Sequence, residues 1–219
     1  MHNNVIFRRE NDEESARDVS YLCNIDASDW QQQFMIYLNK TISNPEDLKG
    51  MKLRSSPTFK TVFQHFGAVP VAMKMGDVNL ALKNNLVEGL GSTADEGVIS
   101  YSIYEVCKYF VTPGFGMPEN VWLWNLNSWE TIPPDFKKII TETVVDVEAE
   151  WETKMNDYHK SLIDEFEKHG MKKIVLDEAS GKRLTEAYND SQWKWVIEKS
   201  PNNGAQLRKL AGLPPLPIN

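Results

Sequence analysis

Arg54 is the residue of this chain whose type and position best suit ligand binding. It ends the short apolar-basic run 51–54, which follows a turn over residues 45–50 and is expected to be extended. An arginine at the carboxyl end of a buried strand directs its guanidinium into the crevice where α/β proteins bind ligands. Its planar fork can hold a carboxylate with two parallel hydrogen bonds. An ordinary surface arginine on a loop would fit the same residues.

Catalytic and metal-binding patterns are missing from the sequence. It contains no nucleophile elbow, P-loop, Rossmann glycine triplet or His-Glu-x-x-His motif. The four histidines are scattered, and Cys23 and Cys107 are too few for a metal site and leave a disulfide undecided. The carboxylates between 146 and 152 are expected on a solvated helix face. An enzyme is therefore the least favoured class, and no metal or cofactor is expected.

The composition indicates a globular chain of 219 residues, with 41% hydrophobic and 25% charged residues. Its formal net charge of −7 argues against a nucleic-acid partner and an anionic membrane surface. No apolar run has the length of a signal-peptide core or a membrane helix. An acidic ligand would therefore have to be held by a local positive group inside a negatively charged protein.

Hydrophobic periodicity predicts strands alternating with helices, which is typical of an α/β fold with a parallel sheet. Gly89 and Gly91 are interpreted as turn residues, with a loop over 90–93. Trp122 and Trp124 share one side of a strand, where burial under a helix is favoured over ligand stacking. The expected strands are 33–38, 51–54, 69–73, 86–89, 104–111, 121–125 and 172–176, and the expected helices are 57–66, 77–85, 136–169, 178–198 and 205–210.

The helix over 136–169 decides the expected domain organisation. At 1.5 Å per residue it is about 50 Å long, so it must cross between two lobes or pack against another chain. We expect residues 1–31 to be a leading segment or the remnant of a first lobe, and 32–117 to form a ligand-binding α/β lobe. Residues 118–170 then supply a returning strand and the long spanning helix, and 171–219 supply C-terminal helices that pack on the lobe.

The blocks at 39–54, 66–73, 77–82, 86–89, 104–109 and 129–135, in this order and spacing, resemble the substrate-binding proteins of tripartite ATP-independent periplasmic (TRAP) transporters. The resemblance implies a periplasmic-binding-protein-like α/β fold, with one lobe largely complete and part of a second. It also implies a non-catalytic protein that captures a small organic acid in the periplasm and delivers it to membrane permease subunits. The family's hallmark arginine falls on Arg54, and Ser92, Asn120 and Trp122 are the residues expected to line the cleft beside it.

The sequence also departs from the family pattern in two respects. The chain looks N-terminally truncated, and Phe34 stands where some sialic-acid binders carry a second arginine, so sialic acid is not expected. The apolar stripe of the long helix would then lack its usual cover and favour a homo-oligomer. A second hypothesis follows, in which the chain is a non-binding fragment that acts as an assembly or dimerisation module through this helix.

Overall fold

The computed structural model describes residues 19–21, 34–116 and 123–213. The chain divides into two compact units. The first, which we call the helical unit, comprises Met1–Gln31 and Pro118–Lys160. The second, the sheet unit, comprises Gln32–Met117 and Ser161–Asn219.

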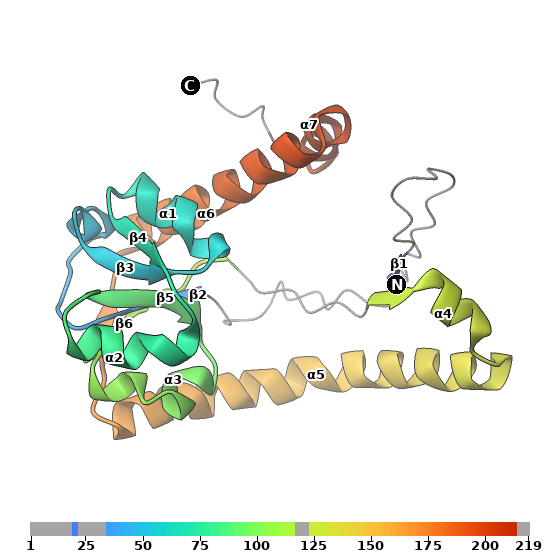
Figure 1. The fold of residues 1–219 in the computed structure, drawn as a ribbon, viewed down its shortest axis with the longest axis horizontal. Helices are drawn as coiled ribbons and strands as arrows, with labels where there is room; N and C mark the ends of the chain where they lie inside the picture. The colour runs from blue at the N-terminus through green and yellow to red at the C-terminus, as the bar shows by residue number, and fades with distance from the viewer. Residues whose placement is uncertain (1–18, 22–33, 117–122, 214–219) are drawn as a thin grey trace. The chain divides into compact units, whose positions relative to one another are not determined.

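A six-stranded sheet forms the centre of the sheet unit, with the strand order β4-β3-β5-β2-β6-β8 (Figure 1). Strand β2 is antiparallel to both of its neighbours, and the other neighbouring pairs are parallel. The carboxyl ends of β3, β4 and β5 therefore meet at one edge of the sheet, together with the amino end of β2. This arrangement confirms the predicted α/β class, but the sheet is mixed and not all parallel as predicted, because β2 runs against both of its neighbours. The strands are β2 (Phe34–Leu38), β3 (Lys52–Ser55), β4 (Val69–Ala72), β5 (Gly89–Thr93), β6 (Tyr109–Thr112) and β8 (Lys172–Val175).

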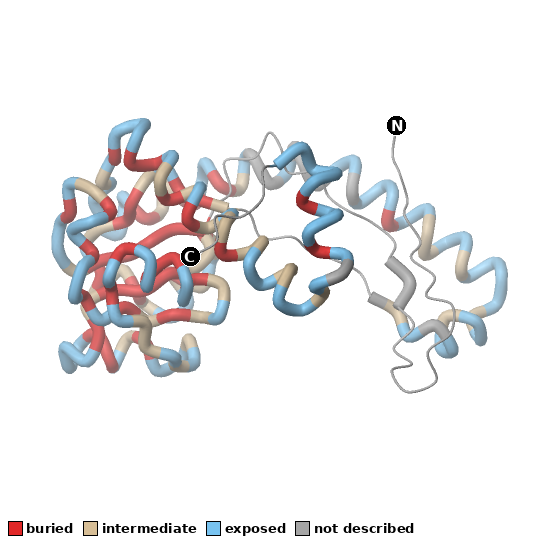
Figure 2. Tube along the Cα trace, turned by 90° about the horizontal axis from the view of Figure 1, so that it is seen from above, coloured by how far each residue is buried: buried red, intermediate tan, exposed pale blue. Residues whose placement is uncertain are grey.

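Helices cover both faces of this sheet (Figure 1). Helices α1 (Pro57–His65) and α6 (Glu178–Lys199) lie on one face, and α2 (Val78–Lys83) and α3 (Gly97–Ser100) lie on the other with the last turns of α5 (Pro134–Lys168). Helix α7 (Pro201–Leu210) packs on α6. Three short 3-10 helices also belong to the unit: η1 (Pro45–Leu48), η2 (Met75–Asp77) and η3 (Ile103–Glu105). Buried residues concentrate in the strands and their covering helices (Figure 2).

Local sequence signals explain where β3 and α1 begin. Gly50 has φ +79°, a conformation that side chains disfavour, and its amide donates to the Gly67 carbonyl at 2.8 Å. This contact aligns the starts of β3 and β4. At the other end of β3, Pro57 occupies the first turn of α1, where its missing N–H costs nothing. The chain therefore turns into a helix two residues after Ser55, which leaves Arg54 at the sheet edge.

The two faces of the sheet have separate apolar cores. On the α1/α6 face, the buried Phe59 ring packs edge-on against Phe34 and Phe115 at centroid distances of 5.0 and 5.8 Å. On the other face, Phe166 of α5 meets the rings of Tyr37 and Phe110 at 5.9 and 5.7 Å. The end of the long helix is thus fixed to the sheet unit by aromatic packing.

The helical unit contains an antiparallel pair, β1 (Val19–Tyr21) with β7 (Leu123–Asn125), followed by α4 (Leu126–Thr131) and the first part of α5. Trp124 and Trp129 lie 5.5 Å apart and pack against Val144 and Ile140 of α5. Trp124 therefore packs under the long helix, as expected, whereas Trp122 lies outside the described residues.

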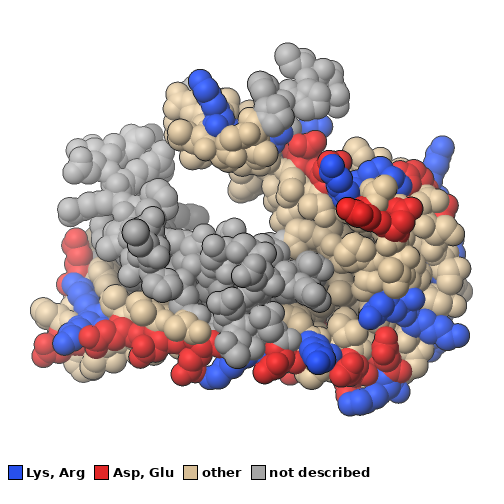
Figure 3. All heavy atoms as spheres, turned by 180° about the vertical axis from the view of Figure 1, so that it is seen from behind, with Lys and Arg blue, Asp and Glu red and all other residues tan. Residues whose placement is uncertain are grey.

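Acidic side chains follow the exposed side of α5 (Figure 3). Asp146 and Glu150, from the carboxylate run, are exposed on this helix. Glu150 pairs with Lys154 one turn away. These observations agree with a solvated helix face rather than a catalytic or metal site.

Two predicted strands were wrong. The strand expected at 86–89 is β5 at Gly89–Thr93, and the run 104–111 divides into η3 and the shorter β6. Gly89 and Gly91 lie within a strand. Glycine is needed at both positions because neighbouring atoms leave no room for a side chain. A Cβ on Gly89 would lie 2.7 Å from Leu38 Cδ2, and one on Gly91 would overlap the Phe59 ring.

We expect Gly91→Ala to destabilise the protein by about 1–3 kcal/mol, because the new methyl group overlaps a ring that is locked in the core. Thermal and urea unfolding would measure this loss. Gly76→Ala is the matched control, since the nearest atom to its added Cβ lies 4.0 Å away. Equal stabilities for the two variants would contradict the close packing of Phe59 on Gly91.

Candidate functional site

The structure places Arg54 at the carboxyl end of β3, between β4 and β5. Its side chain is partly buried and held by two backbone carbonyls. Nε donates to Met73 O at 3.2 Å and Nη1 donates to Gly91 O at 3.3 Å. A guanidinium has five N–H groups. Both terminal nitrogens thus keep N–H groups for a further acceptor, in the fork geometry that suits a carboxylate.

The environment of the Arg54 charge is otherwise neutral in the described part of the chain. Among the residues that the structure describes, no Asp or Glu forms an ion pair with it. Burial lowers the pKa of Arg54, and that desolvation is the cause of the shift. Arginine pKa values are high enough for the group to stay charged. A partly buried cation with neutral partners attracts an anion at this edge of the sheet.

Ser92 lies on the same face of the sheet as Arg54. Arg54 is paired with Leu90 in the parallel β3–β5 ladder, and Ser92 follows two residues later on β5. Because side chains alternate along a strand, all three face the same way. Ser92 is partly buried. The structure therefore brings together two of the predicted ligand-binding residues, while Asn120 and Trp122 lie outside the described part of the chain.

The end of β5 beside this site is held in place by side chains. The fully buried Tyr37 donates its hydroxyl to Thr93 O at 3.2 Å. Burial, followed by the nearby Asp95 carboxylate, raises the pKa of Tyr37, so the hydroxyl remains a donor. Asp95 accepts from the Thr93 hydroxyl and, at 2.8 Å, from the Gly97 amide. The rim of the site is therefore rigid on this side.

Sequence reasoning missed the groups that position Arg54. The acceptors on Met73 and Gly91 are backbone carbonyls, so their side-chain types gave no signal. Gly91 itself could have been noticed, because a glycine inside a strand often marks close backbone approach.

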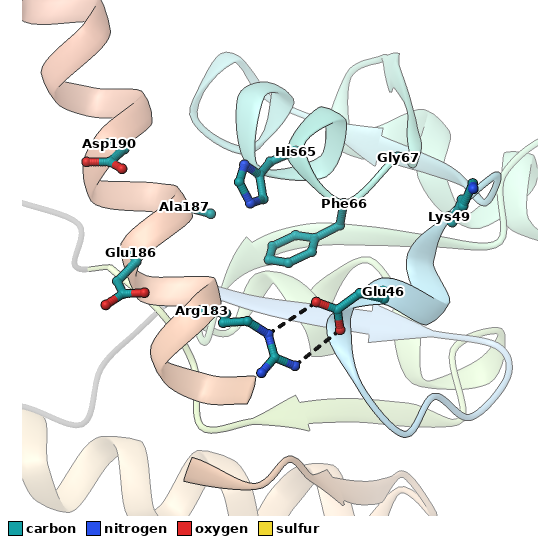
Figure 4. A pocket seen from close by; sticks show the side chains of 9 residues that line it. All are labelled: Glu46, Lys49, His65, Phe66, Gly67, Arg183, Glu186, Ala187 and Asp190. Atoms are coloured by element: carbon teal, nitrogen blue, oxygen red, sulfur yellow. Dashed lines mark hydrogen bonds and ion pairs between the residues drawn. The ribbon is translucent and has the colours of Figure 1, made fainter. Parts of the chain in front are cut away.

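A pocket with a volume of about 600 Å³ lies on the α1/α6 face, apart from Arg54. Arg183 of α6 donates to Glu46 of η1 through Nε at 3.1 Å and Nη2 at 3.2 Å (Figure 4). The side chains of His65, at the end of α1, and of Phe66, which follows it, point toward α6 in the same view. The arginine of this pocket, unlike Arg54, already has its carboxylate. It is therefore the weaker candidate for an anion site.

Other chemistry is absent from the described residues. In ranges 19–21, 34–116 and 123–213, no cluster of His, Cys, Asp and Glu could hold a metal ion. Over the same ranges, every helix is too short or too polar to cross a membrane. Cys107 is fully buried, and burial raises the pKa of its thiol to about 12, so it is not a nucleophile.

Comparisons with known proteins agree with this geometry. Residues 24–199 match the model of the bacterial extracellular solute-binding proteins, family 7. The C4-dicarboxylate-binding protein DctB of Bacillus subtilis is 27% identical over 148 residues, which are 66% of this chain and 41% of that protein. The chain thus spans less than half of this relative's length.

Solved structures of TRAP periplasmic solute-binding proteins share the fold. One from Desulfovibrio salexigens with bound orotic acid is 25% identical, with a TM-score of 0.74. One from Rhodoferax ferrireducens with bound malonate is 19% identical, with a TM-score of 0.70. Each match covers 89% of this chain and 61% of the solved one.

These matches confirm the predicted resemblance to the TRAP substrate-binding proteins. With most of its length matched by the family model, the chain belongs to the bacterial extracellular solute-binding proteins of family 7.

Proposed function

We propose that this chain binds a small organic acid by its carboxylate, with Arg54 as the main anchor, as the solute receptor of a TRAP transporter. The observation that carries the proposal is the partly buried guanidinium of Arg54, held by two carbonyls and lacking a carboxylate among the described residues. Family membership supports it, as do the C4-dicarboxylate named for the Bacillus relative and the acids bound in the solved relatives.

Arg54 alone does not account for useful affinity. A charge-assisted hydrogen bond contributes about 1.5–3 kcal/mol, whereas micromolar binding requires about 8 kcal/mol. Further contacts and enclosure from water must supply the difference. We propose Ser92, Asn120 and Trp122 as additional contacts.

The family also suggests a location and a partner. We propose that the chain works in the periplasm and delivers its acid to the membrane permease subunits of the transporter. The formal net charge of −7 repels anions at long range, so capture depends on the local charge of Arg54.

A second candidate function, assembly of copies of this chain, is favoured by the surface of α5. Phe136 and Ile139 are 60% and 57% exposed, and Val147 continues the same side of the helix. This stripe lies next to Ile140 and Val144, which pack under Trp124 and Trp129. Exposed apolar stripes tend to associate, so we propose a homodimer through α5.

For the binding function, we expect Arg54→Ala to lower acid affinity by about ten- to a hundredfold, because it removes a charge-assisted bond. A thermal-shift screen of mono- and dicarboxylates would find a ligand, since binding to the native state raises the melting temperature. Calorimetry would then measure the affinity of each variant.

Arg183→Ala is the matched control for Arg54→Ala. Its guanidinium already pairs with Glu46 in a partly exposed setting, worth at most about 1 kcal/mol of stability. We expect acid affinity within twofold of the original chain. Unchanged acid affinity in Arg54→Ala, or equal losses of affinity in both variants, would show that Arg54 does not anchor the acid.

For the assembly function, we expect sedimentation to show a dimer that Ile139→Lys dissociates, because burying the ammonium in an apolar interface is costly. Leu80→Lys, at another exposed apolar position on α2, should leave the dimer intact. A monomer at high concentration of the unmodified chain would remove this candidate.

A further inference from the structure

Tyr101 is an exposed aromatic residue on a backbone that is fixed from several sides. Its amide donates to Gly97 O at 3.0 Å. The Asn79 side chain donates to the carbonyls of Tyr101 and Ser102 at 3.2 and 2.7 Å. The turn is thereby fastened to both α2 and α3.

The turn after Tyr101 is strained. Ser102 has φ +51°, in the left-handed region that a residue with a side chain disfavours. Such a conformation persists only where surrounding contacts enforce it, and it is found preferentially at functional sites. Here the Asn79 amide enforces it. The result is a Tyr101 side chain that remains 46% exposed although its backbone is rigid.

The Tyr101 ring lies beside η2, in the connection that follows β4, and beside the first residue of α3, which follows β5. Its Cε1 is 4.0 Å from the position of a Cβ on Gly76, and its Cδ2 is 3.9 Å from that of a Cβ on Gly97. Gly76 comes three residues after Met73, whose carbonyl holds Arg54. The ring therefore lies against the same loop after β4 whose Met73 carbonyl holds Arg54.

We propose that Tyr101 is a ligand-contacting residue at the outer rim of the Arg54 site. The site then takes an organic acid whose carboxylate binds Arg54 and whose far end is a planar or apolar ring that packs on Tyr101. This inference rests on the proposed function. An exposed tyrosine offers a large apolar face at little cost in conformational entropy, and a ring seated on it gains from both burial and aromatic contact.

A matched pair of probes isolates the ring contact. Calorimetry would compare 3-phenylpropanoate, which has a ring, with butanoate, in which a methyl group replaces that ring. We expect the original chain to bind the ring acid more tightly. Tyr101→Ala should reduce that preference by a factor of about three to ten, and Tyr101→Phe should keep it. The affinity for butanoate should not change in either variant.

Trp195→Ala is the control for loss of an exposed aromatic ring, because Trp195 is 58% exposed on α6, across the sheet from α2 and α3. It should leave both affinities unchanged. A ring preference that survives in Tyr101→Ala, or no ring preference in the original chain, would overturn the inference. If the original chain binds neither probe, the inference also fails, and the carboxylate screen above then shows separately whether the Arg54 site binds any acid.

Discussion

The charge of Arg54, which pairs with no Asp or Glu of the described residues, is the constraint to which the end of the sheet is adapted. Moving a cation out of water is costly unless other groups solvate it. Two backbone carbonyls, on Met73 and Gly91, provide part of that solvation. Carbonyl dipoles hold the guanidinium in place without neutralising it. The remaining N–H groups of Arg54 bond to no described residue, whereas the guanidinium of Arg183 already pairs with the carboxylate of Glu46.

The strand order makes this arrangement available. Because β3 lies between β4 and β5 and runs parallel to both, all three strands end at the same edge. The carbonyls that follow β4 and lie within β5 then flank the side chain at the end of β3. Phe59 of α1 packs directly on the backbone of Gly91, so α1 and β5 can lie close together. The opposite face, where Phe166 meets Tyr37, fastens the end of α5 beneath the same sheet.

Sequence reasoning found the features that depend on side-chain type and helical periodicity. The long helix was predicted within a few residues of α5, and Arg54 was placed at a strand end because a turn and a strand pattern bracket it. The strand β5 was missed because its two glycines look like turn residues until the positions of Leu38 and Phe59 are known. The carbonyls that hold Arg54 could not be predicted, since every residue type has a backbone carbonyl and the sequence does not show which of them accept hydrogen bonds. The fixed position of Tyr101 depends on a contact from Asn79, which is distant in sequence.

The measurement that tests the central claim most directly is nitrogen-15 NMR of the arginine side chains during titration with malonate, with the Arg54 signal assigned from Arg54→Lys. A carboxylate that binds the free edge of the guanidinium should shift the Arg54 signals and slow rotation about its terminal C–N bonds, because each nitrogen gains an acceptor. The signals of Arg183, whose carboxylate partner is already present, should stay in place. Malonate that shifts Arg183 and leaves Arg54 unchanged would contradict the account.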